Sequence, residues 1–194
     1  MAEERLSKDQ IVDAAEAALR RFGLAKTSVV DVARSLGVTH GALYRHFDGK
    51  ADIVDAVSAR WLERINGPLA VIAAETGPAA ERLRRWFDVL IASQTAQAQN
   101  DPELFLAFAE MARRDSRCVA AELERRATHV AKIIDDGRAQ GAFNAPNPVE
   151  AAHALLDAAT KFLAPDHVAD WRKPEAAARF DAAFRLLLQG LATR

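Results

Sequence analysis

The chain has 194 residues, half of them hydrophobic, with 26 basic and 27 acidic side chains and a formal net charge of −1. This length fits one medium domain or a small domain joined to a larger one, and the composition excludes a disordered chain. The charge balance argues against indiscriminate binding to nucleic acid or to an anionic membrane, although it can hide a local binding surface.

A single cysteine, Cys118, excludes an internal disulfide and favours a reducing compartment. The sequence opens without a basic-then-apolar signal segment, and no apolar run approaches the ~20 residues needed to span a bilayer. We therefore expect a cytoplasmic protein without a membrane partner.

An all-α fold is predicted, because strand signals are nearly absent and apolar residues recur at helical spacing. The first helix begins after Ser7, which forms a capping-box pattern with Gln10, and ends at Gly23. Its predicted apolar stripe consists of Ile11, Ala14, Ala15, Ala18, Leu19 and Phe22.

Two short helices follow the first one. Ser28 with Asp31 starts the second helix and Gly37 ends it, while Thr39 can cap a third helix that extends to about residue 47. Two short helices joined by a tight glycine-containing turn are typical of a helix-turn-helix. The sequence thus predicts a three-helix DNA-binding unit at 1–50 and a larger helical body at 51–194.

The larger body begins with a long helix from Lys50, which Asn66-Gly67-Pro68 is expected to kink or break. Further helices are predicted after Gly77-Pro78, from Pro102, over about 117–139, from Asn147-Pro148 to about Leu163, and from Pro174 to about Leu191.

The stretch VTHGALYRHFDGK, residues 38–50, concentrates polar and aromatic side chains. His40 and His46 are six residues apart, about 120° off a common helix face, so they do not form a chelating pair, and Arg45 beside them would oppose a cation. No serine or cysteine nucleophile partners either histidine locally. We expect no catalytic residue, no metal and no cofactor here.

A DNA-contacting surface explains this stretch better. Leu43 and Phe47 lie four residues apart and can anchor the third helix to the core together with Val38. The residues expected to face outward are Thr39, His40, Gly41, Ala42, Tyr44, Arg45 and His46. Gly41 lowers helix propensity by ~1 kcal/mol but permits close backbone approach, and Lys50 can reach a phosphate from the next helix.

The run TSVVDVARSLGVTHGALYRHFDGKADIV, residues 27–54, resembles the DNA-binding segment of the TetR family of bacterial transcriptional regulators. The resemblance rests on the threonine before the second helix, the Val-x-Asp-Val-Ala core, Gly-Val-Thr in the turn, Gly-x-Leu-Tyr-x-His-Phe after it, and Lys50. It covers about residues 7–60 and departs mildly at Leu36, where alanine is common. Beyond this region only the length and the helical pattern match the family.

The resemblance implies a double-stranded DNA operator and a role for each matching position. Thr27 and Ser28 would meet phosphate, whereas Tyr44, His46 and Lys50 would grip the DNA backbone. The residues that would face the major groove are Thr39, His40, Gly41, Ala42 and Arg45. With one arginine in the recognition helix, little bidentate guanine reading is expected, and DNA shape would contribute to specificity.

A homodimer on a pseudo-palindromic operator is expected, since one such unit alone would bind DNA weakly. The candidate interface residues are Leu155, Phe162, Phe180, Phe184, Leu187 and Leu188, on two apolar stripes. From the residues alone, these stripes are equally well explained as intramolecular core, and the family resemblance favours the dimer.

The family also implies a small-molecule effector held inside the C-terminal body. The candidate lining residues are Trp86, Phe87, Leu90, Phe105, Phe108 and Met111, with His129 and His153 as polar groups. The alternative is an ordinary aromatic core with satisfied histidines. A metal held by these histidines with Glu110 or Asp157 has no support from their spacing.

Together these features predict a transcriptional regulator, most simply a dimeric repressor released from its operator by a largely apolar effector. Asn66-Gly67-Pro68 would then be the hinge of the helix from Lys50, or only a loop. A helical enzyme would need a convergent catalytic cluster that we do not find. A pure helical interaction module would leave residues 27–50 unexplained.

Overall fold

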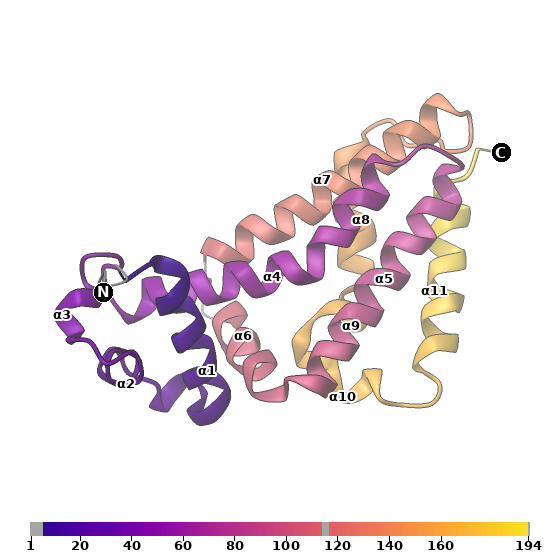
Figure 1. Ribbon diagram of the computed structural model, residues 1–194. Helices are drawn as coiled ribbons and strands as arrows, with labels where there is room; N and C mark the ends of the chain where they lie inside the picture. Colours follow the sequence, from indigo (N-terminus) through magenta and orange to yellow (C-terminus); the bar gives the residue numbers. More distant parts are fainter. Residues whose placement is uncertain (1–5, 114–116, 194) are drawn as a thin grey trace. The chain divides into compact units, whose positions relative to one another are not determined.

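The computed structural model describes residues 6–113 and 117–193, apart from the side chains at 111, 112, 117 and 118. These residues form helices joined by short loops, and the described part of the chain contains no β-strand beyond one isolated bridge between Phe143 and Ala192. The predicted all-α fold is confirmed. The chain divides into two compact units, whose helices can be followed by label in Figure 1.

The N-terminal unit extends through Glu63 and also includes residues 100–119. It contains α1 (Lys8–Lys26), α2 (Val29–Ser35), α3 (His40–Leu43), the first part of α4 (Lys50–Ala74), and α6 (Pro102–Arg113). Helix α1 packs against both α2 and α6, and α2 packs against α3. This compact unit therefore includes two segments beyond residue 50, while the functional boundary predicted there stays a prediction.

The C-terminal unit comprises residues 64–99 and the chain from Ala120 onward. Its elements are the rest of α4, α5 (Ala79–Asn100), α7 (Arg117–Ala139), α8 (Pro148–Ala158), α9 (Thr160–Leu163), the 3-10 helix η1 (Pro165–His167), α10 (Val168–Trp171) and α11 (Ala176–Leu191). The predicted helix from Asn147 to Leu163 is thus two helices, separated at Ala159.

Helix starts follow the predicted capping residues, except that Thr39 precedes α3 without a side-chain capping bond. The backbone N–H of Gln10 donates to Ser7 Oγ at 3.2 Å, and the Ser7 N–H donates to Gln10 Oε1 at 2.8 Å, which completes the capping box of α1. Ser28 caps α2 through the N–H of Asp31, and Asn147 caps α8. These local bonds satisfy N–H groups that have no partner within a helix.

The end of α1 differs from the prediction. Gly23, with a φ of 72°, interrupts the helical backbone, but helical structure resumes and continues to Lys26. This change of direction lets Leu24 be buried, whereas Phe22 is 45% exposed. Phe22 was therefore wrongly assigned to the buried stripe.

Helix α4 continues from Lys50 to Ala74, so of the two predicted alternatives at Asn66-Gly67-Pro68, the break is wrong and the kink stays a prediction. Proline inside a helix removes one backbone hydrogen bond, and neighbouring packing can hold the helix together. Here Asn66 is 2% exposed, and its Oδ1 accepts a hydrogen bond from Arg126 Nε at 3.2 Å. A loop-like hinge is consequently absent from this part of α4.

Close helix packing in the C-terminal unit requires a glycine. A β-carbon at Gly137 in α7 would lie 2.2 Å from the Phe143 ring and 2.9 Å from Ala79 Cβ. Phe143 also donates its N–H to the Gly137 carbonyl at 3.2 Å. Gly137 therefore allows the loop after α7 to fold back onto that helix.

Candidate nucleic-acid interface

The turn between α2 and α3 has the geometry that the sequence predicts. Gly37 adopts a φ of 67°, a left-handed conformation that glycine tolerates without strain. Its N–H donates to the Arg34 carbonyl at 3.1 Å, and the Val38 N–H donates to the Ala33 carbonyl at 3.1 Å. These bonds close the end of α2 and direct the chain into α3.

Helix α3 is one short turn that is fixed by buried side chains. Leu43 is fully buried and Phe47 is 5% exposed, as the anchoring role predicts. The helix spans only His40–Leu43, and residues 44–46 form a turn, so the predicted extension to residue 47 is too long. Ala42 is 8% exposed and packs inward, so its predicted outward orientation is wrong.

The exposed side of this segment carries the polar and aromatic groups. Thr39, His40, Gly41, Tyr44 and Arg45 are all exposed, and His46 is half-buried. The His40 and Tyr44 rings meet edge to face, with their centroids 6.2 Å apart. The segment therefore presents hydrogen-bonding groups on a support that is anchored from below.

Gly41 is not required by internal packing. A β-carbon there would meet only Thr39 Oγ1, at 4.0 Å, which is ordinary van der Waals contact. Its backbone has no positive φ either. The absence of a side chain consequently clears space only on the outer side, where another molecule can approach the backbone.

Three residues predicted to contact phosphate engage in internal hydrogen bonds. The Thr27 hydroxyl is buried and donates to the Gly23 carbonyl at 2.8 Å, and the Ser28 hydroxyl donates to Asp31 Oδ2 at 2.5 Å. Lys50 Nζ donates to the Leu24 carbonyl at 2.7 Å. Lys50 thereby joins the start of α4 to the end of α1. The phosphate contacts of these three residues stay predictions.

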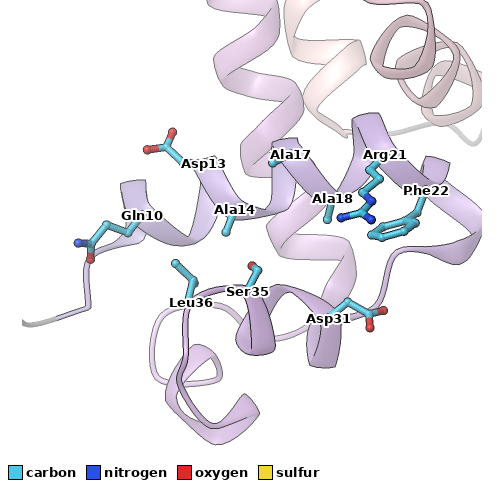
Figure 2. A pocket seen from close by; sticks show the side chains of 10 residues that line it. All are labelled: Gln10, Asp13, Ala14, Ala17, Ala18, Arg21, Phe22, Asp31, Ser35 and Leu36. Atoms are coloured by element: carbon cyan, nitrogen blue, oxygen red, sulfur yellow. The ribbon is translucent and has the colours of Figure 1, made fainter.

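A groove of about 500 Å³ runs between α1 and α2, as Figure 2 shows. Its lining includes Ala14, Ala17 and Ala18 of α1, which have small side chains, and Phe22, and the Arg21 guanidinium lies 5.1 Å from the Phe22 ring centroid. The carboxylates of Asp13 and Asp31 also border the groove. Because carboxylates repel phosphate, this groove is poorly suited to nucleic acid.

The predicted effector-lining residues fall into two groups. Trp86, Phe87 and Leu90 are buried in the C-terminal unit, and the Trp86 ring lies edge to face with His129 at a centroid distance of 6.5 Å. Burial lowers the pKa of His129, and the charges of Arg125 and Arg126 lower it further. His153 is 45% exposed, 3.9 Å from Glu124.

The second group belongs to the N-terminal unit. Phe105 and Phe108 pack against Trp61, with centroid distances of 6.2 and 4.4 Å. Met111 lies in α6, and its side chain is outside the described residues. The eight predicted positions thus do not form one cluster within a single unit.

Among the described residues, no group of three or more His, Cys, Asp or Glu side chains could hold a metal ion. Within the same residues, no helix is long and apolar enough to cross a membrane.

Comparison with known proteins identifies the family. Residues 11–57 match the family model described as bacterial regulatory proteins, tetR family. Residues 79–184, more than half of the chain, match the tetracyclin repressor-like C-terminal domain. The chain belongs to the TetR family. The resemblance inferred from residues 27–54 is thereby confirmed, and the family is one of regulators rather than enzymes.

Among TetR-family relatives, the transcriptional regulator TtgR of Pseudomonas putida is 44% identical over 55 residues, 28% of this chain and 26% of TtgR. The chain thus spans about a quarter of the length of the first curated relatives that it matches.

Among solved structures, SmeT, the repressor of a Stenotrophomonas maltophilia multidrug efflux pump, aligns with a TM-score of 0.69 at 21% identity, over 97% of this chain and 92% of SmeT. FadR from Bacillus subtilis, solved in complex with stearoyl-CoA, aligns with a TM-score of 0.70 at 19% identity, over 95% of this chain and all of FadR. At these identities, the two structures show a shared fold.

The residues predicted for a TetR-type dimer interface are largely internal to this chain. Phe180 and Phe184 of α11 are buried and pack against Phe87 of α5, with ring centroids 6.2 and 5.6 Å apart. Leu155 is also buried, whereas Phe162, Leu187 and Leu188 are half-buried. Leu186, which the prediction omitted, is 69% exposed. Their part in a dimer stays a prediction.

Sequence reasoning missed the buried polar residues of the TetR-type C-terminal unit. Arg82, Glu122 and Arg126 are 4%, 4% and 6% exposed. A signal was available in α7, because Glu122, Arg126 and the apolar Val130 and Ile133 recur at spacings of three and four residues. This spacing places them on one helix face, which the structure buries.

Proposed function

We propose that this TetR-family chain is a cytoplasmic, dimeric repressor that binds a pseudo-palindromic operator and leaves it when a small, largely apolar effector binds. The observation that carries the proposal is the exposed surface of Thr39, His40, Tyr44 and Arg45, held on the buried Leu43 and Phe47. The family match supports the same surface as the DNA-contacting one.

On DNA, Thr39, His40 and Arg45 would reach base edges, and the backbone at Gly41 would approach the groove closely. Tyr44, His46, Ser28 and Lys50 would position the protein on phosphates. Phosphate binding by Lys50 would replace its hydrogen bond to the Leu24 carbonyl. DNA binding would therefore loosen a contact between the end of α1 and the start of α4.

A symmetric dimer would place two copies of this surface one DNA turn apart, about 34–36 Å. The exposed Leu186 and the half-buried Leu187 and Leu188 are apolar side chains of α11 that a partner copy would cover in part, and α8 would contribute its exposed side. Effector binding in the C-terminal unit would favour a conformation with a different half-site spacing. That FadR is solved with stearoyl-CoA supports an effector with an apolar body.

Gel shift with the DNA flanking its own gene tests the proposal, at several salt concentrations and against unrelated DNA of equal length. We expect preferential retardation of the flanking DNA, with an affinity that falls as salt rises. His40→Ala should reduce the preference, and His153→Ala, a half-exposed histidine of the C-terminal unit, is the matched control. Equal binding to both DNAs at every salt concentration would refute the proposal.

Gly41→Ala separates stability from recognition. Because the new methyl group has room and alanine favours helix, the free energy of unfolding should rise, by up to ~1 kcal/mol. Operator affinity should nevertheless fall by about tenfold, since disturbing one close approach to a base pair costs roughly 1–3 kcal/mol. Chemical denaturation and gel shift on the same preparation measure both effects. Unchanged operator affinity would mean that Gly41 does not approach DNA.

A further inference from the structure

Arg126 of α7 is a buried guanidinium that the packing of the C-terminal unit leaves incompletely paired. It is 6% exposed, and its Nε donates to Asn66 Oδ1 at 3.2 Å. The nearest carboxylate oxygen, Glu122 Oε1, lies 3.8 Å from the same nitrogen, beyond hydrogen-bond distance. Within the described part of the chain, no hydrogen bond reaches Nη1 or Nη2 of Arg126.

Arg82 in the same unit is a buried arginine with a fully hydrogen-bonded guanidinium. It is 4% exposed, and all three of its nitrogens donate. Nε and Nη2 reach the carbonyls of Ile72 and Ala73 at 3.4 and 2.8 Å, and Nη1 reaches Asp136 at 2.9 Å. Arg82 thus caps the end of α4 with every nitrogen in use, whereas Arg126 leaves its outer donors available.

The missing hydrogen bonds of Arg126 matter for its free energy because the guanidinium is charged. Burial lowers its pKa to about 10, and the Glu122 charge opposes the shift only in part. The side chain is therefore still cationic at neutral pH. A buried cation without full pairing is unfavourable, so a second anion beside it would gain more than it would at an exposed arginine.

His129, which follows Arg126 on α7, and Trp86, which packs on His129, each carry a buried polar atom without a hydrogen-bond partner among the described residues. His129 is on the same helix three residues later, and its Nδ1 is buried without a hydrogen-bond partner among the described residues. The indole Nε1 of Trp86, whose ring packs edge to face with His129, is likewise buried and unpaired there. An indole N–H only donates, so Trp86 and Arg126 both need an acceptor.

The apolar surroundings limit what such an acceptor can belong to. Trp86, which packs on His129, is fully buried, and so are Val130 and Ile133, which follow Arg126 on the same face of α7. A free inorganic anion would lose its hydration here without compensation for most of its surface. A carboxylate attached to an apolar body would satisfy the guanidinium and the packing together.

We propose that Arg126 anchors the carboxylate of an amphipathic organic acid, with Trp86 and His129 beside it, and that this acid is the class of effector that the C-terminal unit takes. That this acid acts as an effector rests on the proposed function. Its binding at Arg126 does not depend on DNA binding. Planar pairing through the Nη atoms gives the carboxylate two parallel hydrogen bonds.

Calorimetric titration of the full-length chain, without DNA, tests the anchor with two matched pairs of probes: decanoate with decanamide, and 4-phenylbutanoate with its amide. We expect at least one acid to bind about tenfold or more tightly than its own amide, because a hydrogen bond to a charged group is worth more than one to a neutral group. Arg126→Gln should remove this preference, and Arg126→Lys should keep part of it.

Arg138→Gln is the control, since Arg138 lies on the same helix, is 40% exposed and changes the charge identically. It should bind like the original chain. Equal affinity for acid and amide, no binding of either acid, or an acid preference that survives in Arg126→Gln would each overturn the proposal. If Arg126→Gln fails to fold, the acid–amide comparison in the original chain and in Arg126→Lys decides. If only the gel shift failed, the proposed function would be refuted, but the binding of the acid at Arg126 would not be.

Discussion

A buried glutamate of the N-terminal unit and a buried arginine of the C-terminal unit differ in how their charges are paired. In the N-terminal unit, Glu16 of α1 is 3% exposed and lies between two arginines, Arg60 of α4 at 2.8 Å and Arg20 one turn along. Arg60 also pairs with Asp13 at 2.6 Å, and Arg20 with Asp101 at 2.7 Å. We call these five residues the Glu16 network.

In the C-terminal unit, Arg82 is likewise buried and fully hydrogen-bonded, whereas the buried Arg126 has one direct hydrogen bond and one longer ion pair. A buried ion can have two different roles. A charge surrounded by opposite charges fixes the helices that carry it, whereas an incompletely paired charge retains affinity for a ligand. The Glu16 network therefore stabilises the support of the proposed DNA-contacting surface, and we propose Arg126 for ligand binding.

The largest expected effect distinguishes the two buried arginines of the C-terminal unit. Arg82→Met should lower the free energy of unfolding by about 3–5 kcal/mol, because it leaves the Ile72 and Ala73 carbonyls without their donor. Arg126→Met should lower it by about 1 kcal/mol or less, since it removes few hydrogen bonds and methionine fills the space. Urea denaturation of both variants measures the difference. Equal losses would mean that Arg126 is structural as well.

Glu16→Gln tests the Glu16 network. Removing the buried carboxylate leaves Arg20 and Arg60 with weaker partners, and we expect a loss of about 2–3 kcal/mol in urea denaturation. Asp13→Asn is the control, because the Asp13 side chain is 69% exposed and should change stability by about 0.5 kcal/mol or less. A loss at Asp13 as large as that at Glu16 would contradict the structural role assigned to burial.

Lys50→Ala removes a side chain that donates a hydrogen bond within the N-terminal unit and that we propose contacts a phosphate when DNA is bound. Loss of the hydrogen bond to the Leu24 carbonyl should lower the free energy of unfolding by about 1 kcal/mol. Operator affinity should fall, and the slope of log affinity against log salt should decrease in magnitude by about 1.8 for the dimer, because one phosphate in each half-site is no longer neutralised. A lower stability with an unchanged salt slope would assign Lys50 to the fold alone.

The smallest expected effect concerns pH. Because the folded state depresses the pKa of His129, the unfolded chain binds more protons as pH falls through the ordinary histidine range, and stability is lost in that range. The depression is caused first by burial and then by Arg125 and Arg126. His129→Gln should therefore flatten the stability profile between about pH 7 and pH 5, measured by thermal unfolding. His153→Gln is the control, and an unflattened profile in His129→Gln would argue against this assignment.

Local patterns predicted the helix starts and the helix-turn-helix. Ser7 with Gln10, Ser28, Gly37 and Asn147 all act through neighbours within four residues, so sequence spacing contains the needed information. The exposed set around His40 and Tyr44 was likewise available, since Leu43 and Phe47 define its opposite side. These features depend on backbone geometry rather than on distant contacts.

Other features needed the assembled helices. Proline at position 68 suggested an interruption, but α4 is packed and bonded along its length, and tertiary contacts outweigh the loss of one backbone hydrogen bond. Ala42 and Phe22 lie on helix faces whose burial depends on neighbouring elements, and the periodicity assigned both to the wrong environment.

The sequence by itself determined an all-α chain, a helix-turn-helix at its N-terminal end and the side chains that this motif exposes, because each follows from spacing over a few residues. Only the tertiary structure decided that Lys50 donates a hydrogen bond back to α1 and that Glu16 lies between two arginines. It also decided that Arg126 is buried with Nη donors that make no hydrogen bond within the described residues. The pairing of a buried charge depends on residues brought from distant parts of the chain, and no local pattern encodes that proximity.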